Sequence, residues 1–409
     1  MPGPLAGIRI FDVTRILAGP TATQVLADLG ADVIKVERPG RGDDVRGWGP
    51  PYLHDPDGNV CPADSVYFNA ANRNKRSITL NLASAEGQVL AKRLIGECDV
   101  VFENYKVGDL NKYGLAYEQL KDDNPRLVYC SLTGFGQTGP YADRAGFDLV
   151  VQAMGGMMSI TGPEGGEPGD GVKVGVGIAD IMTGMYCNIA ILAALRHRDA
   201  TGEGQHLDLS LLDCQVAWLV NEGMNFLHTG NRPKPWGTAH ATIVPYQSFP
   251  DAHGEHFILA VGNDRQFQRF CAFAGAPELA EDPRFVTNPQ RVQHRPECVG
   301  AVAALTRQHP REHWLEGLPP LGVPCGPVNA IDQVFDEPQV KARGMRIEIE
   351  HPASDKPEAY IASPIRMEKT PVEYRRPAPM LGEHTEEVLD ELLGIGADEV
   401  ADLRQKGAI

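Results

Sequence analysis

The chain has 409 residues, of which 42% are hydrophobic and 22% are charged, a composition typical of soluble globular enzymes. Its length predicts two or three domains with a large buried core. The formal net charge of -16 argues against a general nucleic-acid-binding protein. The eight cysteines are scattered singly without a CxxC pair, so we expect reduced thiols and no disulfide framework.

Strand and helix patterns alternate along the first 135 residues. In the first helix, expected over 20–29, Pro20 stands where its missing N–H is not needed and Gly30 suits the turn that follows. The alternation predicts an α/β fold with a doubly wound parallel sheet. A further helix begins near residue 84, and strands are expected at 8–13, 32–37, 77–82, 100–104 and 127–132.

The middle of the chain continues with helices and then changes in texture. Helices are expected from about residues 147 and 180, followed by a strand at 206–211 and one long helix over 211–227. From Gly230 the sequence becomes rich in proline and turn residues, which is typical of a linker into a second unit. That unit is expected to hold strands at 243–249 and 256–262 and helices up to about residue 318. Two short helices, two strands and a final amphipathic helix follow, and this helix is expected to pack on the first sheet.

The amino-terminal segment shows no targeting signal. A strand pattern begins within the first ten residues, which leaves no room for a signal or transit peptide. No run approaches the roughly 18 apolar residues of a membrane span. We therefore expect a cytoplasmic protein without a membrane or nucleic-acid partner.

Asp180 is the only charged residue between Val174 and Leu195, in a stretch otherwise made of apolar, glycine and small polar residues. A desolvated carboxylate of this kind is a candidate for nucleophilic catalysis. The alternative is that Asp180 caps the helix that begins near it, because Asp is favoured at that position. Spacing alone favours the cap.

A GxGxxG pattern occurs at Gly134, Gly136 and Gly139. It does not predict NAD binding, because that fingerprint belongs to the first strand-helix turn and here Pro140 interrupts it. The loop remains a candidate substrate loop, since glycine lets backbone N–H groups approach a ligand. We also expect no metal site, because no HExxH pattern occurs and Pro310 separates the histidines at 309 and 313.

Eight segments in the same order resemble the class III CoA-transferases over nearly the whole chain. The segment KPWGTAHATIVPYQSF and the RAGFD loop look most like the branch that moves CoA from succinyl-CoA to glutarate or hydroxymethylglutarate. The eight segments are PLAGIRIFDVTRILAGPTATQVLADLGADVIKVERPGRGDD, NRNKRSITLNL, VFENYKVGDLNKYGL, SLTGFGQTGP, RAGFDLVVQAMGG, GIADIMTGMY, GVPCGPV and LGEHTEEVL.

The resemblance implies an interlocked homodimer of ring-shaped chains that uses acyl-CoA as a substrate. It implies a large Rossmann-like domain formed by residues 1–229, a small α+β domain formed by 230–325, and a segment 326–409 that returns to the large domain. The activity implied is transfer of CoA from succinyl-CoA to a dicarboxylate through an aspartyl anhydride and an aspartyl-CoA thioester.

The resemblance also assigns site residues. The family's nucleophile falls on Asp180, which adds a second argument for catalysis, and the backbone at Gly134 and Gly136 is expected to bind the oxyanion or the substrate. Arg38 and Lys112 suit the adenosine and pyrophosphate end of CoA. The full set of CoA contacts that carries over by position is Leu17, Ala18, Arg38, Leu80, Asn104, Tyr105 and Lys112.

Basic residues are the natural candidates for the acceptor carboxylate, although each is equally consistent with a structural role. These candidates are Arg46, Arg73, Lys75, Arg144 and His240.

Two other functions remain open. The related α-methylacyl-CoA racemases use the histidine of a Gly-His-Asp triplet as one of two proton carriers, but here the triplet reads Gly146, Phe147, Asp148. Phenylalanine cannot exchange protons, so transfer is favoured over racemisation. The third candidate, a non-catalytic acyl-CoA-binding protein, is disfavoured because Asp180 is intact.

Overall fold

The computed structural model describes residues 3–55, 57–354 and 356–409. Contacts within the chain divide it into two units. Unit 1 comprises Met1–Met157, Lys173–His228 and Gln339–Ile409, and unit 2 comprises Met158–Val172 and Thr229–Pro338. Compared with the expected bounds of 1–229, 230–325 and 326–409, residues 158–172, 229 and 326–338 group with unit 2.

Unit 1 is built on a six-stranded parallel sheet with the order β5-β2-β1-β6-β7-β8. The chain starts in the middle, moves outward to β5 and then returns to the other side of β1. This order places a topological switch between β1 and β6, where ligands bind in open α/β sheets. The strands are β1 (Arg9–Asp12), β2 (Asp32–Glu37), β5 (Lys75–Thr79), β6 (Val100–Glu103), β7 (Val128–Thr133) and β8 (His206–Ser210).

The six expected strands are therefore confirmed, with the largest difference at β5. The strand was expected at 77–82 and is found at Lys75–Thr79. The shift places two basic residues, Lys75 and Arg76, inside the sheet.

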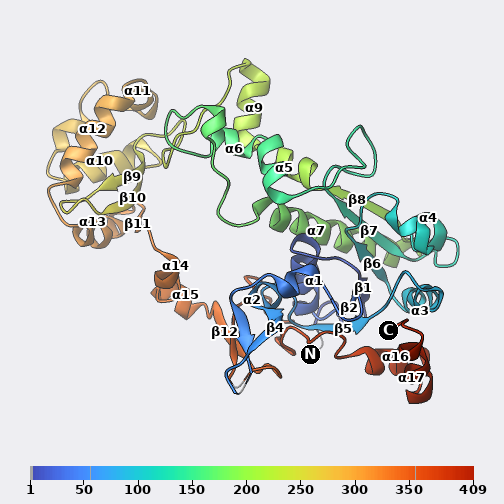
Figure 1. Ribbon diagram of the computed structural model, residues 1–409. Helices are drawn as coiled ribbons and strands as arrows, with labels where there is room; N and C mark the ends of the chain where they lie inside the picture. Colours follow the sequence, from blue (N-terminus) through green and yellow to red (C-terminus); the bar gives the residue numbers. More distant parts are fainter. Residues whose placement is uncertain (1–2, 56, 355) are drawn as a thin grey trace. The chain divides into compact units, whose positions relative to one another are not determined.

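Helices cover both faces of this sheet (Figure 1). Helices α1 (Ala18–Asp28) and α7 (Ile178–Thr201) form one core with the strands, in which Ala22, Leu26 and Ile191 are fully buried. Helices α3 (Ala85–Gly96), α16 (Thr385–Leu393) and α17 (Ala397–Gln405) share the other core with β2 and β5. The expected packing of the carboxyl-terminal segment on the first sheet is confirmed, although it consists of two helices instead of one.

The prediction of one long helix over 211–227 is wrong. The segment forms α8 (Leu211–Ala217) and α9 (Val220–Thr229). Val220 has a φ of 39°, a backbone conformation that a continuous right-handed helix does not contain. The remaining elements of unit 1 are β3 (Tyr52–His54), β4 (Val60–Ser65), α2 (Val66–Asn69), α4 (Tyr117–Leu120), α5 (Asp148–Met154), α15 (Pro338–Ala342), β12 (Arg346–Ile349) and β13 (Glu358–Ile361).

Unit 2 has its own core around the buried Trp314, which packs against Phe257 and Phe270. Its antiparallel sheet has the order β11-β10-β9, and α12 lies against β9. The elements are α6 (Met157–Ile160), β9 (Tyr246–Pro250), β10 (His256–Ala260), α10 (Asp264–Phe273), α11 (Asn288–Gln293), α12 (Arg295–Thr306), α13 (Arg311–Gly317), β11 (Cys325–Pro327) and α14 (Ile331–Val334).

Helix α7 changes one expectation from the sequence. It is long and apolar enough to cross a membrane by length and composition, with a mean hydropathy of 1.6 over its best 18-residue window. Half of that window is buried inside the protein, where the helix packs against α1 and the sheet. The statement that no run has the composition of a span is therefore wrong, and the packing of α7 is that of a core helix.

Candidate active site

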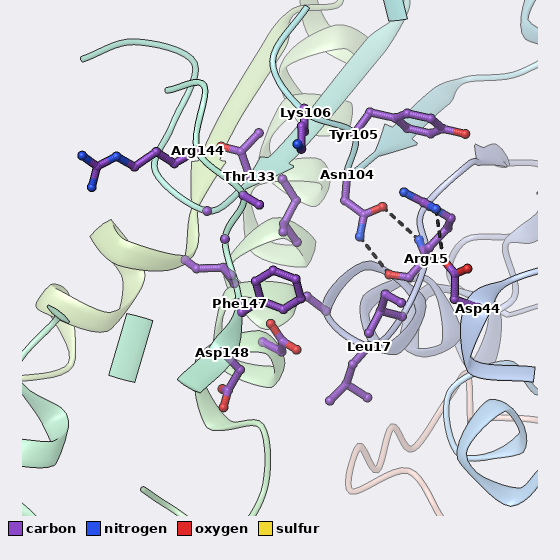
Figure 2. Close-up of a pocket in the computed structure, with 18 of the residues that line it drawn as sticks. Arg15, Leu17, Asp44, Asn104, Tyr105, Lys106, Thr133, Arg144, Phe147 and Asp148 are labelled. Atoms are coloured by element: carbon purple, nitrogen blue, oxygen red, sulfur yellow. Dashed lines mark hydrogen bonds and ion pairs between the residues drawn. The ribbon is translucent and has the colours of Figure 1, made fainter. Parts of the chain in front are cut away.

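A pocket of about 600 Å³ opens at the carboxyl ends of β1, β6 and β7, on both sides of the switch point. Its walls come from three segments that follow these strands and from the amino-terminal turns of α5 and α7 (Figure 2). Every lining residue belongs to unit 1. The lining residues used below are Arg15, Ile16, Leu17, Ala18, Arg41, Asp44, Trp48, Asn104, Tyr105, Lys106, Gly134, Arg144, Gly146, Phe147, Asp148 and Asp180.

Asp180 lines this pocket from the first turn of α7, but it does not cap the helix. The N-cap residue is Gly177, and the N–H of Ala179 donates to Asp148 Oδ1 at 2.8 Å. In the described part of the chain, no hydrogen bond or ion pair holds the Asp180 carboxylate. The capping interpretation is therefore wrong, and the group that serves the helix end is Asp148.

Burial raises the pKa of Asp180 to about 7, and the nearby Asp148 adds to this effect. The pKa of Tyr67 is also raised, first by burial and then by Asp180, which places its phenol in the field of this carboxylate. A carboxylate that is poorly solvated and has no hydrogen-bond donor is more reactive toward carbonyl carbon than one in water.

The wall after β1 is fixed by the side chain of Asn104. Its Oδ1 accepts from the N–H of Arg15 at 2.9 Å, and its Nδ2 donates to the carbonyl of the same residue at 2.8 Å (Figure 2). The Arg15 guanidinium pairs with Asp44 at 3.0 Å and lies 5.3 Å from the centre of the Tyr105 ring. Its Nε is buried without a hydrogen-bond partner among the described residues, so a donor remains available for a ligand.

Two glycines bring the RAGFD loop against the end of β7. A Cβ on Gly134 would lie 2.3 Å from the Cα of Gly146, so neither position accepts a side chain without moving the backbone. This contact sets Phe147, which is 64% exposed, at the pocket. Gly136 differs, since it does not line the pocket and its N–H donates to Thr133 Oγ1 at 2.9 Å. Of the two expected oxyanion donors, only Gly134 lies at the site.

The seven expected CoA contacts lie in four different places. Four of them line the pocket, and Arg38 lines a small adjoining cavity that shares Arg15 and Tyr105 with it. Lys112 is exposed and pairs with Asp109, while Leu80, directly after β5, is buried in the core that α3 and α16 share with the sheet. The four that line the pocket are Leu17, Ala18, Asn104 and Tyr105.

Three residues that were expected to bind the acceptor carboxylate form buried ion pairs inside the protein. Arg46 binds Glu37 through two nitrogens at 2.8 Å, Arg73 binds Asp28 at 2.6 Å, and Lys75 lies 3.4 Å from Asp12. These basic side chains are at most 5% exposed and do not line the pocket. Burial lowers the pKa of Lys75 to about 7, partly offset by Asp12. We correct their assignment from substrate binding to structure, because their charges are already compensated.

The other two candidates lie in different units. Arg144 lines the pocket, with its guanidinium 3.8 Å from the centre of the Tyr141 ring. His240 belongs to unit 2, where its Nδ1 accepts from the N–H of Thr242. Sequence reasoning missed the pocket cations Arg15 and Lys106. A usable signal existed for both, because each lies three residues after the end of its strand, β1 or β6, at the switch point.

The fold and the pocket are those of an α/β protein with a partly buried carboxylate in a pocket at the switch point of its sheet, and comparison with known proteins makes the class specific. The sequence model described as CoA-transferase family III matches residues 5–385. The chain belongs to CoA-transferase family III. It is an enzyme that uses CoA thioester substrates, as the resemblance noted from sequence implied.

Individual relatives agree over nearly the full length. The chain is 50% identical to the succinate–glutarate CoA-transferase of Agrobacterium fabrum, covering 95% of this chain and 96% of the relative. It is 42% identical to the succinyl-CoA:glutarate CoA-transferase of Homo sapiens, covering 99% and 90%. The crystal structure of a CAIB/BAIF family protein from Brucella suis superposes with a TM-score of 0.83 at 47% identity, covering 96% and 100%.

Proposed function

We propose that this enzyme moves CoA from succinyl-CoA to a dicarboxylate such as glutarate or hydroxymethylglutarate, with Asp180 as the nucleophile. The observation that carries the proposal is the unpaired, partly buried carboxylate of Asp180 at the pocket. The choice of succinyl-CoA and glutarate is supported by the names of the relatives from Agrobacterium fabrum and Homo sapiens, and hydroxymethylglutarate is suggested by the family resemblance alone.

The reaction is a series of acyl exchanges at Asp180. The carboxylate attacks the thioester carbonyl of the donor, the C–S bond breaks, and CoA leaves as a thiolate while a mixed anhydride forms. The thiolate then attacks the aspartyl carbonyl, which releases the donor acid and leaves an aspartyl-CoA thioester. The acceptor carboxylate displaces the thiolate to give a second anhydride, and the thiolate takes the acceptor acyl group and frees Asp180. Each anhydride must be kept from water until the next exchange.

Several pocket groups suit this chemistry. Helix α1 begins at the pocket with Ala18, and α7 presents Asp180 to the pocket from its first turn. Helix amino termini favour negative charge, so both helix ends suit anionic groups in the pocket. The unpaired Nε of Arg15 and the exposed guanidinium of Arg144 suit the phosphates of CoA or the second carboxylate of a dicarboxylate. The backbone at Gly134 is the proposed oxyanion donor.

A panel of acids tests the proposal. With succinyl-CoA as donor, we expect glutarate or hydroxymethylglutarate to give the highest kcat/KM, and a monocarboxylate of similar length to fall by roughly 10- to 100-fold because one charged hydrogen bond is lost. Products are measured by mass spectrometry of the acyl-CoA. Equal rates with monocarboxylates would refute the dicarboxylate assignment.

The same assay in deuterated buffer examines the racemase alternative. We expect a 2-methylacyl-CoA to return without deuterium at C2, because Phe147 occupies the place of a proton carrier. Deuteration at C2 at a rate comparable to CoA exchange would favour racemisation. Absence of both reactions would favour a binding protein.

We further propose that the protein is a homodimer. Apolar side chains lie exposed on α5, α7 and α8, which contact one another, and on α9, which follows α8 in the chain, and exposed apolar patches often mark protein–protein interfaces. The interlocked arrangement implied by the family resemblance covers such a surface with a second copy. The exposed side chains are Leu149, Val150, Met154, Ile189, Leu192, Val216, Val220, Met224, Phe226 and Leu227.

Dilution tests the interlocked form. A ring threaded through its partner cannot dissociate without unfolding, so we expect a dimer in mass photometry at nanomolar concentration over hours. A folded and active monomer on dilution would exclude interlocking.

A further inference from the structure

Ile16 holds a backbone conformation that β-branched residues rarely adopt. Its φ is 74°, in the left-handed region where the branched side chain crowds the backbone. Such a conformation persists only where the surrounding structure imposes it. Ile16 lies in the turn between β1 and α1, and the four residues from Arg15 to Ala18 line the pocket. The shape of this pocket wall therefore depends on what holds Ile16.

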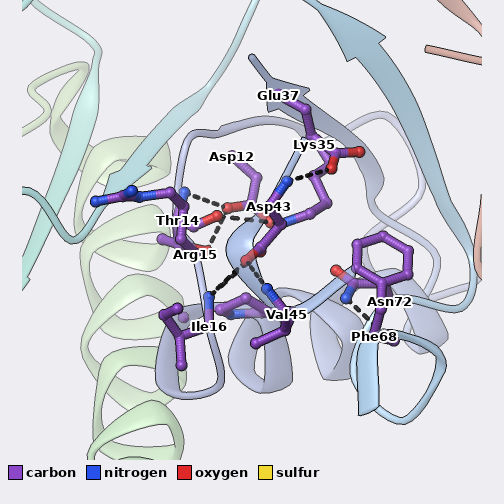
Figure 3. A network of polar contacts seen from close by, with 12 residues as sticks. Asp12, Thr14, Arg15, Ile16, Lys35, Glu37, Asp43, Val45, Phe68 and Asn72 are labelled. Carbon is purple, nitrogen blue, oxygen red and sulfur yellow. Dashed lines mark hydrogen bonds and ion pairs between the residues drawn. The ribbon is translucent and has the colours of Figure 1, made fainter. Parts of the chain in front are cut away.

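The side chain of Asp43 supplies that constraint (Figure 3). Its two oxygens accept from the N–H of Ile16 at 3.1 and 3.3 Å. Lys35 Nζ donates to Asp43 at 2.9 Å and to the carbonyl of Thr14 at 3.1 Å, so the ion pair holds the turn on both sides of Arg15. The side chains of Asp43 and Lys35 are 0% and 1% exposed. A paired charge in such a site is difficult to displace, because separating it leaves its partner buried and uncompensated.

Asp43 also connects this wall with a second one. Its Oδ1 accepts from the N–H of Val45 at 3.2 Å and so caps the short 3₁₀ helix Asp44–Gly47. The segment around this helix contributes Arg41, Asp44 and Trp48 to the pocket. One carboxylate behind the pocket therefore fixes two of its walls, although Asp43 itself does not line it.

We propose that Asp43, paired with Lys35, is a positioning residue for acyl-CoA. By holding Ile16 in the left-handed conformation, it keeps Leu17 and Ala18 at the start of α1 in the orientation that binds the thioester. This inference rests on the proposed function, because it takes the pocket to be the acyl-CoA site.

The test is a set of variants measured by calorimetric titration with CoA and by kinetics. In Asp43→Asn, we expect CoA affinity to fall and the KM for succinyl-CoA to rise by roughly 10- to 100-fold, with kcat at saturation within about threefold of the wild type. The physical reason is that the neutral amide does not compensate the charge of Lys35 and accepts a weaker hydrogen bond from the Ile16 N–H. An unchanged affinity in a folded variant would overturn the proposal.

A second substitution separates positioning from general damage. Asparagine tolerates the left-handed conformation, so Ile16→Asn lowers the need for an external constraint. We expect Asp43→Asn to cost at most about threefold in CoA affinity when introduced into Ile16→Asn, which is clear non-additivity. Equal losses in the two backgrounds would mean that Asp43 does not act through Ile16.

Asp28→Asn is the matched control. Asp28 is also a buried acid paired with a base, Arg73, at 2.6 Å in unit 1, but it does not line or border the pocket. We expect this variant to lose stability and to keep its CoA affinity. If Asp28→Asn lost as much CoA affinity as Asp43→Asn, the effect of Asp43 on binding would be explained by loss of stability and not by positioning.

Hydrogen exchange of the wild type gives a measurement that needs no variant. If Asp43 preforms the turn, the amide of Ile16 is protected in the free protein, and adding CoA changes its exchange little. Fast exchange in the free protein with protection only after CoA is added would overturn the proposal even if Asp43→Asn does not fold. If the wild type does not bind CoA in the titration, the proposed function is wrong, whereas the conclusion that Asp43 holds the turn at Ile16 is not affected.

Discussion

Replacing Asp180 with alanine is expected to lower kcat by about 10⁴-fold or more, with CoA affinity and fold retained. The loss of a nucleophile removes the whole covalent route, whereas other pocket contacts to CoA remain. The carboxylate makes no hydrogen bond or ion pair to the described residues, so its removal breaks no internal contact. The measurement is kcat for CoA transfer together with CoA affinity by titration.

Glu399→Gln serves as the control for this substitution. Glu399 has the same position in the first turn of α17 that Asp180 has in α7, but it is exposed and does not line the pocket. We expect its kcat to stay at the wild-type value. A loss of activity in both variants would mean that losing any acidic residue from a helix amino terminus lowers activity, and it would not support Asp180 as the nucleophile.

Covalent trapping identifies the group directly. The wild type incubated with succinyl-CoA and then hydroxylamine is expected to carry a mass change within residues 177–186, at Asp180. Near wild-type transfer by Asp180→Ala, or modification of a different residue, would contradict its role as nucleophile.

The sheet could be predicted because its strands are short apolar runs separated by helical patterns. The order of the strands in the sheet, and with it the position of the switch point, comes from the structure, because the order of segments along the chain does not determine which strands pair. The break between α8 and α9 could not be predicted, since nothing near Val220 in the sequence marks it as a turn. Its positive φ of 39° is a conformation that β-branched residues rarely adopt, so local propensity gave no reason to expect a break at this position.

Part of the candidate site could be expected from the family resemblance, but the sequence did not show which basic residues are used in internal ion pairs. Asn104 and Tyr105 follow β6 directly and line the pocket as expected. Arg46 and Lys75 looked equally available in the sequence, but their acidic partners Glu37 and Asp12 lie on other strands or turns. Only the fold brings these partners together, so sequence could not separate a structural cation from a ligand-binding one. A cytoplasmic location and the lack of NAD and metal stay predictions.

The ionisation of Asp180 also predicts an effect on stability. Its pKa is raised from 3.8 to about 7 in the folded protein, so folding favours the protonated form. The stabilising contribution is complete below about pH 4 and is lost as the pH rises through about 7. Above that pH the folded state carries a poorly solvated charge next to Asp148. Removing this charge should therefore stabilise the protein at high pH.

We expect Asp180→Asn to be more stable than the wild type by about 1–4 kcal/mol at pH 8, the range reflecting partial exposure of the carboxylate. The isosteric amide keeps the shape of the site and does not ionise, so the difference in Tm between the two proteins should vanish near pH 4 and grow to a few degrees by pH 8. Thermal unfolding across this pH range, with Glu399→Gln as the control, measures it. Equal Tm values at pH 8 would mean that Asp180 is well solvated when charged, which would also weaken the argument for its reactivity, since desolvation is the common cause of both effects.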